Sequence, residues 1–282
     1  MRFATLIDDG GATAAVLVDD RRVLPLEGAG PGLDSVRGVA ASGQAGLRRI
    51  REWAPLQPPR LYRSLDDVRL GPAVPDPGAI YTIGLNYVAP DDHAAGPARP
   101  LVYAKLPTSV IGHGAMVSWD RSLTDNVDPE VELGVVIGET AVAVRPEDAL
   151  QHIFGYTCID DISSRDPWLD GDQWLLGKSF AGFCPVGPWV VTPDEVEAQD
   201  TSLGCTINGT PIQAGTTGHM RHSIADVIAY LSRHTMLRPG DLIATGTPAR
   251  LAGPVGPERH LQPGDVITCR IEGIGELTTT IG

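Results

Sequence analysis

Lysine is almost absent from this chain of 282 residues: only Lys105 and Lys178 are lysine, and every other basic side chain apart from histidine is arginine. Positive charge is scarce overall, because 35 acidic residues outnumber 22 basic ones and give a formal net charge of −13. Nucleic acids and anionic membrane surfaces are bound through clustered positive charge. The composition therefore argues against both as the main partner and favours a small-molecule ligand.

Paired cysteines and long apolar runs are also missing. No C-x-x-C pair occurs among the four cysteines, which are Cys158, Cys184, Cys205 and Cys269. Their wide spacing argues against a disulfide framework or a zinc site and favours a reducing compartment. No charge-free apolar run approaches the ~20 residues of a membrane span, and the N-terminus does not resemble a signal peptide. We expect a cytoplasmic protein that has no membrane partner.

Glycine and proline, by contrast, are abundant, with 33 and 24 residues. This predicts many turns and short elements, so that strands and loops outweigh helix in a mixed, β-rich α+β fold. Short apolar runs predict strands at 3–7, 14–18, 80–83, 131–137, 155–159, 189–192, 242–244 and 266–271. The prolines between residues 65 and 79 favour an extended linker. We place there the boundary between a small N-terminal domain, residues 1–70, and a larger domain, residues 71–282.

Few helices are expected. A glycine-interrupted helical stretch follows the N-terminal strands, at about residues 35–53. The clearest helix spans residues 223–234, where Ser223 and Asp226 have the spacing of a capping box and an apolar stripe repeats at helical spacing. A second, short helix is predicted to start near Pro146 and to cover residues 147–154.

The most informative segment is Asp128-Pro129-Glu130-Val131-Glu132-Leu133, which leads into an apolar strand. On a strand, Glu130 and Glu132 share one face, roughly 6 to 7 Å apart, while the valines and leucine face the core. Two carboxylates at that spacing can converge on one divalent cation. An ordinary half-exposed strand with a polar outer face explains the same pattern equally well.

A second acidic segment favours the metal-binding interpretation. The predicted strand at 155–159 ends in Asp160 and Asp161, followed by Ile-Ser-Ser-Arg165-Asp166. Three carboxylates form an all-oxygen site that selects a hard cation such as Mg²⁺ or Mn²⁺. For one of the two aspartates, a helix cap or a turn remains the alternative.

Lys178 lies in Trp174-Leu-Leu-Gly-Lys178-Ser-Phe180, among apolar neighbours. We expect its ammonium group to be partly buried beside the metal, where it stabilises an enolate or takes part in proton transfer. The alternative is a solvated surface lysine, which the rarity of lysine in this chain disfavours.

Together these motifs resemble the fumarylacetoacetate hydrolase (FAH) family. The matching strings run in family order from about residue 80 to 275 and include Ile83-Gly84-Leu85-Asn86-Tyr87, Asp128-x-Glu130-x-Glu132-Leu133, Asp160-Asp161-Ile-Ser-Ser-Arg165-Asp166, Lys178-Ser179-Phe180 and Thr245-Gly246-Thr247-Pro248. The resemblance implies an FAH-type mixed β-sheet roll with a small N-terminal α/β domain, and a homodimer.

The resemblance also assigns roles to residues. It implies that Glu130, Glu132 and Asp161 bind Mg²⁺, with Mn²⁺ or Ca²⁺ as alternatives, and that Lys178 is the active-site lysine. Arg165 and Thr247 would line the substrate site. Family substrates are 2-oxo acids and β-dicarbonyl compounds, whose reactions pass through an enolate that the cation and Lys178 stabilise.

The chain departs from the family pattern at three places. Hydrolytic members carry His-x-x-Glu after the Asn-Tyr pair, whereas here the glutamate is missing and His93 is the only candidate base. Trp168 stands where many relatives have a substrate-contacting Gln, which predicts a less polar pocket and a less usual substrate. After Thr247-Pro248 the usual Gly-Val is replaced by Arg250-Leu251-Ala252.

These observations favour a metal-dependent enzyme that hydrolyses a C–C bond in an acylpyruvate-like or β-dicarbonyl substrate, with His93 as base. A decarboxylase or an isomerase is nearly as well supported, because the metal and Lys178 suffice for it. A ligand-binding relative without activity is a third hypothesis, which the complete acidic triad disfavours.

Overall fold

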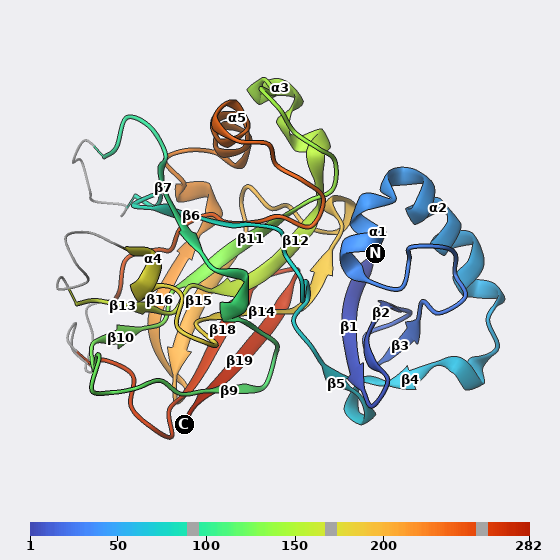
Figure 1. The fold of residues 1–282 in the computed structure, drawn as a ribbon, viewed down its shortest axis with the longest axis horizontal. Helices are drawn as coiled ribbons and strands as arrows, with labels where there is room; N and C mark the ends of the chain where they lie inside the picture. The colour runs from blue at the N-terminus through green and yellow to red at the C-terminus, as the bar shows by residue number, and fades with distance from the viewer. Residues whose placement is uncertain (89–95, 167–173, 252–258) are drawn as a thin grey trace.

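The computed structural model describes residues 1–88, 96–166, 174–251 and 259–282. A twelve-stranded mixed sheet runs through the molecule (Figure 1). Its main path is β4 (Arg63–Ser64), β3 (Arg22–Pro25), β2 (Gly11–Leu17), β1 (Arg2–Asp8), β14 (Cys184–Val191), β12 (Ile153–Asp160), β11 (Val131–Ile137), β17 (Leu242–Ala244), β6 (Ile80–Gly84) and β7 (Leu101–Lys105). Two short strands lie off this path, β5 (Arg69–Leu70) beside β1 and β8 (Val110–Ile111) beside β14.

A second sheet packs against the central strands β11, β12 and β14. Its order is β16 (Thr210–Thr216), β15 (Ser202–Ile207), β18 (Val266–Ile271), β19 (Gly275–Ile281) and β9 (Ala115–Val117). A separate two-stranded ladder joins β10 (Val127–Asp128) to β13 (Ser163–Ser164). Most pairs are antiparallel, whereas β17–β6, β14–β8 and β19–β9 are parallel. The expected mixed, β-rich architecture is confirmed.

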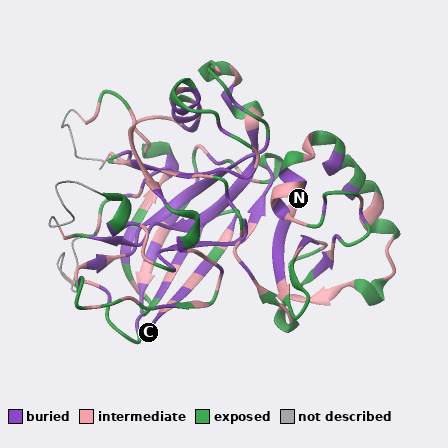
Figure 2. Cartoon of the chain, viewed as in Figure 1, coloured by how far each residue is buried: buried purple, intermediate pink, exposed green. Residues whose placement is uncertain are grey.

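The centre of the core is β11, which is buried along its whole length (Figure 2). Val131, Leu133 and Val135 face the larger apolar cluster, which includes the second sheet and helix α5 (Ile224–His234). Val136 faces the other way, into a cluster that includes the N-terminal helices. The strand therefore alternates as predicted, but both of its faces are covered by apolar layers, which excludes the half-exposed strand.

Helices are few and lie at the edges. The N-terminal region carries α1 (Val36–Ala41) and α2 (Gly43–Trp53), and Ser35 caps α1 by accepting a hydrogen bond from the backbone of Gly38. α5 begins with the predicted capping box, in which Ser223 and Asp226 exchange hydrogen bonds. α4 (Trp174–Gly177) is a single turn. No helix among the described residues is both long enough and apolar enough to cross a membrane.

The predicted helix over residues 147–154 is wrong at its C-terminal end. The helix α3 covers only Pro146–Ala149, a 3₁₀ turn follows at Leu150–His152, and Ile153 already opens β12. Ile153 pairs with Ile137 on β11, and the ring of Phe154 packs on Phe3 with centroids 5.5 Å apart. Packing in the sheet thus overrides the local preference for helix.

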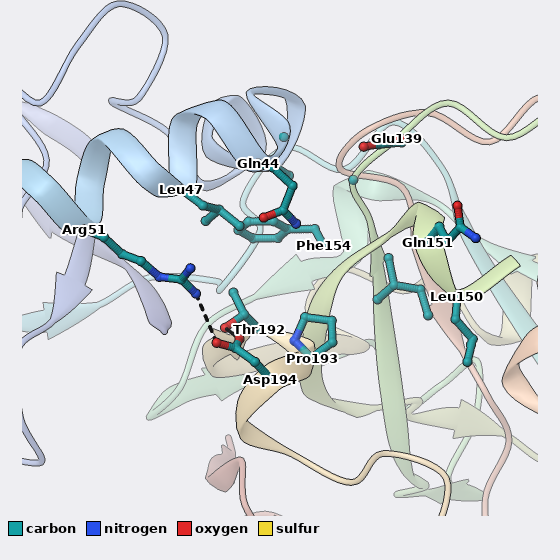
Figure 3. A pocket seen from close by; sticks show the side chains of 14 residues that line it. Gln44, Leu47, Arg51, Glu139, Leu150, Gln151, Phe154, Thr192, Pro193 and Asp194 are labelled. Atoms are coloured by element: carbon teal, nitrogen blue, oxygen red, sulfur yellow. Dashed lines mark hydrogen bonds and ion pairs between the residues drawn. The ribbon is translucent and has the colours of Figure 1, made fainter. Parts of the chain in front are cut away.

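The N-terminal region is joined to the rest of the chain through the sheet, because β1 pairs with β14 at Arg2–Val191 and Phe3–Val190. Beside this junction, α2 faces the start of β12 across a cavity of about 390 Å³, spanned by an ion pair between Arg51 and Asp194 at 3.0 Å (Figure 3). A domain boundary at residue 70 stays a prediction.

Candidate metal and substrate site

Three carboxylates meet where β11 begins and β12 ends. The two strands are antiparallel, with Val131 opposite Asp160. Glu130, just before β11, and Asp161, just after β12, therefore lie at the same end, and the Asp161 N–H donates to the Glu130 carbonyl at 2.9 Å. Glu132 lies on the same face as Glu130, two residues further along. Strand register alone thus brings together side chains about 30 residues apart.

The three side chains form a compact ligand set. One carboxylate oxygen from each of Glu130, Glu132 and Asp161 lies within 4.8 Å of the other two. Glu132 is only 3% exposed and Asp161 only 1%. Buried carboxylates at such spacing repel one another unless cations compensate them.

Both lysines of the chain contact this set. Lys178 Nζ, just after α4, donates to Asp161 Oδ2 at 2.5 Å, to Ser163 Oγ at 2.8 Å and to Glu130 Oε2 at 3.2 Å. Lys105 Nζ, at the end of β7, donates to the other oxygen of Asp161, Oδ1, at 2.6 Å. The predicted burial of Lys178 is confirmed, since it is 6% exposed.

Charge and burial shift the pKa in opposite directions at Lys178 and Glu130, whereas both raise the pKa of Glu132. Burial alone would lower the pKa of Lys178, but Asp161, Glu130 and Glu132 raise it above the usual lysine range. Burial would raise the pKa of Glu130, yet Lys178 and Arg165 lower it to about 2. Burial and the charges of Asp161 and Glu130 raise the pKa of Glu132 well above its usual range. The Lys178 ammonium is therefore a cation and a hydrogen-bond donor rather than a base.

Glu132 indicates that the set is incomplete without a further cation. Its Oε2 accepts the Gly246 N–H at 2.6 Å, and no ion pair reaches it from the residues that the structure describes. The three oxygen donors are those that hard divalent ions such as Mg²⁺ and Mn²⁺ prefer. The residues present therefore fit a divalent cation.

The Gly246 contact explains the Thr-Gly-Thr-Pro motif. Gly246 has φ +100°, and a Cβ there would come within 2.8 Å of the Ile83 carbonyl oxygen and 2.9 Å of Asn86 Cβ. Only glycine brings its N–H to Glu132 without strain. Next to it, Thr247 Oγ1 accepts a hydrogen bond from Gln213 Nε2 at 2.8 Å, which fixes Thr247 at the wall of the site.

Arg165 connects the carboxylate set to Asp128. It donates to Glu130 Oε1 from Nη2 at 2.6 Å and to Asp128 Oδ2 from Nε at 3.1 Å. Asp128 also contacts Arg250 and His260, each at 3.0 Å from its Oδ1. Arg165 is thus bound by two carboxylates, and its side chain is 34% exposed.

A pocket of about 530 Å³ opens over these groups. Its lining includes the carboxylate set, Lys178, Arg165 and Thr247, together with apolar side chains, which are those of Leu85, Leu101, Tyr103, Trp174 and Ile212. The structure therefore brings together six of the eight residues singled out by sequence: Glu130, Glu132, Asp161, Lys178, Arg165 and Thr247. The other two, His93 and Trp168, lie outside the described residues.

Several residues that line the pocket or contact its carboxylates have no role assigned from the sequence, among them Asp128, Thr82 and Arg250. The rarity of lysine singled out Lys105, but no local pattern connects it to Asp161. Thr82 alternates with apolar residues on β6 and looks like an ordinary strand residue, yet its buried Oγ1 lines the pocket with no hydrogen-bond partner among the described residues. Arg250 was visible only as a departure from a family pattern.

Comparison with known proteins agrees with the family resemblance that the sequence motifs indicate. The family model described as fumarylacetoacetate (FAA) hydrolase C-terminal matches residues 79–282. Oxaloacetate tautomerase YisK of Bacillus subtilis is 34% identical over 304 aligned positions that span 100% of both chains.

Two solved structures resemble the whole fold. Fumarylacetoacetate hydrolase of Exiguobacterium antarcticum superposes with a TM-score of 0.84 at 32% identity, covering 100% of this chain and 99% of the other. Maleylpyruvate hydrolase of Sphingobium sp. SYK-6, solved with manganese(II) and pyruvate, has a TM-score of 0.80 at 27% identity, covering 100% and 98%. The expected sheet roll is thereby confirmed.

Proposed function

The chain belongs to the fumarylacetoacetate hydrolase family, and on that premise we propose that it is a divalent-metal-dependent tautomerase that interconverts the keto and enol forms of a 2-oxo acid. The observation that carries this proposal is the position of Lys178 Nζ between Asp161 and Glu130 at the floor of the pocket. A buried, fixed positive charge at that point stabilises the enolate through which a 2-oxo acid exchanges its C3 protons.

Glu130, Glu132 and Asp161 would hold the cation, and we propose Mg²⁺ or Mn²⁺ for it. When bound, such a cation supplies Lewis-acid polarisation of a carbonyl group. Lys178 keeps its proton, and its positive charge stabilises the oxygen on which negative charge develops. Arg165 and Thr247 orient the carboxylate end of the substrate, and the apolar lining residues limit the access of water.

Proton transfer at C3 requires a base, and the pocket-lining carboxylates of the described residues are already engaged. Three of them form the metal-binding set, and Asp128 is bound by two arginines and a histidine. This arrangement supports enolisation better than activation of a water molecule, and so does the loss of the family's water-activating glutamate. His93 stays our prediction for the base.

Hydrolysis of an acylpyruvate-like C–C bond is the second candidate. The likeness to maleylpyruvate hydrolase, whose structure holds manganese(II) and pyruvate, favours it. A homodimer and a cytoplasmic location stay predictions as well.

Exchange of the C3 protons of 2-oxo acids in D₂O, followed by NMR with Mg²⁺ present, tests the proposal. We expect exchange that is lost on chelation and absent in Lys178→Met. Absence of exchange, together with ¹⁸O incorporation from water into a cleaved acylpyruvate, would instead establish hydrolysis.

A further inference from the structure

Gln213 ties the second sheet to the strand that carries the metal ligands. It lies on β16, where a bulge in the pairing with β15 leaves two consecutive residues, Ile212 and Gln213, both buried. Gln213 is 5% exposed, and its amide reaches the start of β11 in the other sheet, where Oε1 accepts the Val131 N–H at 3.0 Å. Because Val131 lies between Glu130 and Glu132, this contact fixes the amide to the backbone that carries the carboxylate set.

The orientation of the Gln213 amide is determined by two backbone groups. The Val131 N–H can only donate, so the amide oxygen faces it. The Pro248 carbonyl can only accept, so the amide nitrogen faces it, with Nε2 at 2.9 Å from the carbonyl oxygen. The second N–H of the same nitrogen donates to Thr247 Oγ1 at 2.8 Å. Both N–H donors are therefore used, and although Gln213 lines the pocket, it has none left for a ligand.

This arrangement decides what the Thr247 hydroxyl group can do. The amide nitrogen of Gln213 has no lone pair to offer, so Thr247 Oγ1 accepts from it and keeps its own proton for another partner. No residue that the structure describes accepts this proton. Thr247 is half-buried and lines the same pocket as the carboxylate set. Its O–H is therefore held as a donor that only a ligand can use.

We propose that Gln213 is a positioning residue that holds the Thr247 hydroxyl as a hydrogen-bond donor to the carboxylate of the substrate. The inference rests on the proposed function in taking a 2-oxo acid as the ligand. A donor that is oriented before binding costs little entropy when the ligand arrives, and donation to an ionised acceptor gives one of the stronger hydrogen bonds. Because the carboxylate is unchanged by enolisation, the contact should lower KM and leave kcat nearly the same.

A double-variant cycle tests whether Gln213 acts through Thr247. It combines Gln213→Met, which removes the amide, with Thr247→Val, which removes the hydroxyl and keeps the shape. Calorimetry at saturating Mn²⁺ measures the Kd for pyruvate. We expect each single variant to raise this Kd by about fivefold to tenfold, and the double variant to bind less than about twofold more weakly than Thr247→Val alone. Thr247→Ser, which keeps the hydroxyl, should bind pyruvate as the unaltered protein does.

Steady-state kinetics add a result that a loss of structure would not give. In Gln213→Met the KM for C3 exchange should rise with the Kd, while kcat changes by less than about twofold. If Gln213→Met does not fold, Gln213→Glu takes its place, because it keeps the length and the contact with Val131. Its carboxylate accepts the Thr247 proton and withdraws it from the substrate, so the loss of pyruvate affinity should be larger with Thr247 present than in Thr247→Val.

Gln199 offers a matched control. Its amide also joins two backbone groups, since Oε1 accepts the Ile224 N–H at 3.2 Å and Nε2 donates to the Thr217 carbonyl at 3.4 Å. It is not among the residues that line the pocket. Gln199→Met should therefore bind pyruvate as the unaltered protein does. Additive losses in the cycle, a loss in Gln199→Met equal to that in Gln213→Met, unchanged binding in Thr247→Val, or no binding of pyruvate at all would overturn the inference.

Failure of the proposed function gives a different result. If tautomerisation is wrong but the inference holds, no 2-oxo acid exchanges its C3 protons, yet pyruvate still binds in a manner that depends on Gln213 through Thr247. If tautomerisation is right and the inference fails, pyruvate exchanges its C3 protons, and the losses caused by Gln213→Met and Thr247→Val are additive.

Discussion

Lys105 and Lys178 hold opposite oxygens of a single carboxylate, that of Asp161, at 2.6 and 2.5 Å. They come from different elements, the end of β7 and the residue after α4, and they are the only lysines of the chain. Every other basic residue apart from histidine is arginine, so a compact ammonium is used where two cations must approach one buried carboxylate. The contact fixes the orientation of Asp161 toward Glu130 and Glu132.

Lys105 should contribute mainly to stability. Its side chain is fully buried, and its removal leaves one oxygen of the buried Asp161 carboxylate without its cationic partner. We expect Lys105→Met to lower the free energy of unfolding by about 3 kcal/mol, as measured by urea denaturation. Arg145→Met, which removes an exposed ion pair with Asp148, serves as control and should cost less than about 1 kcal/mol. Similar losses in the two variants would contradict this assignment.

Lys178 should instead control turnover. We expect Lys178→Met to lower kcat for C3 exchange by at least about 10²-fold, because the positive charge that stabilises the enolate is lost. Addition of Mg²⁺ or Mn²⁺ should still raise the melting temperature of this variant, since the three carboxylates remain. Activity close to that of the unaltered protein would refute the role of Lys178.

Glu132→Gln should change stability in opposite directions with and without metal. Without a divalent cation, the variant replaces a buried acid whose ionisation burial, Asp161 and Glu130 oppose, and we expect its melting temperature to match that of the unaltered protein or to exceed it by about 2 °C. With Mn²⁺ at about 100 times its Kd, the unaltered protein gains about 2.7 kcal/mol, and the variant gains far less.

The control for this comparison of melting temperatures is Glu139→Gln, because Glu139 is exposed. This variant should have the melting temperature of the unaltered protein both with and without Mn²⁺. Thermal scans at fixed pH with EDTA or Mn²⁺ measure both effects. An equal rise with Mn²⁺ in Glu132→Gln would contradict the proposed ligand set.

Gly246→Ala tests the close approach that brings a backbone N–H to Glu132. The alanine must adopt φ +100° and also displace the Ile83 carbonyl and Asn86. We expect a loss of about 3 kcal/mol, from strain together with overpacking, and weaker binding of Mn²⁺. Both are measured by denaturation with and without the metal.

The matched control is Gly264→Ala, because Gly264 has a similar φ of +86° but no atom within 4 Å of an added Cβ. It should cost only about 1 kcal/mol and leave Mn²⁺ binding unchanged. Equal losses of unfolding free energy in the two variants would mean that backbone strain alone, and not the contact with Glu132, explains why position 246 requires glycine.

Some features of this protein were determined by the sequence alone, because they depend on local periodicity. Alternation along residues 130–137 placed Glu130 and Glu132 on one face of a strand, and the capping box at Ser223 fixed the start of α5. The motif strings identified Asp161, Lys178, Arg165 and Thr247 as well. The local pattern wrongly predicted helix at Ile153 and Phe154. These residues form a strand because Ile153 pairs with β11 and Phe154 packs on Phe3.

The tertiary structure decided what depends on distant segments. Lys105 reaches Asp161 across 56 residues, and Arg250 reaches Asp128 across 122. No periodicity encodes such contacts, because the pairing of β6 with β7 and with β17 determines which side chains meet over the end of β11. The sequence thus determined which residues could bind a metal ion, and the fold decided how their charges are balanced.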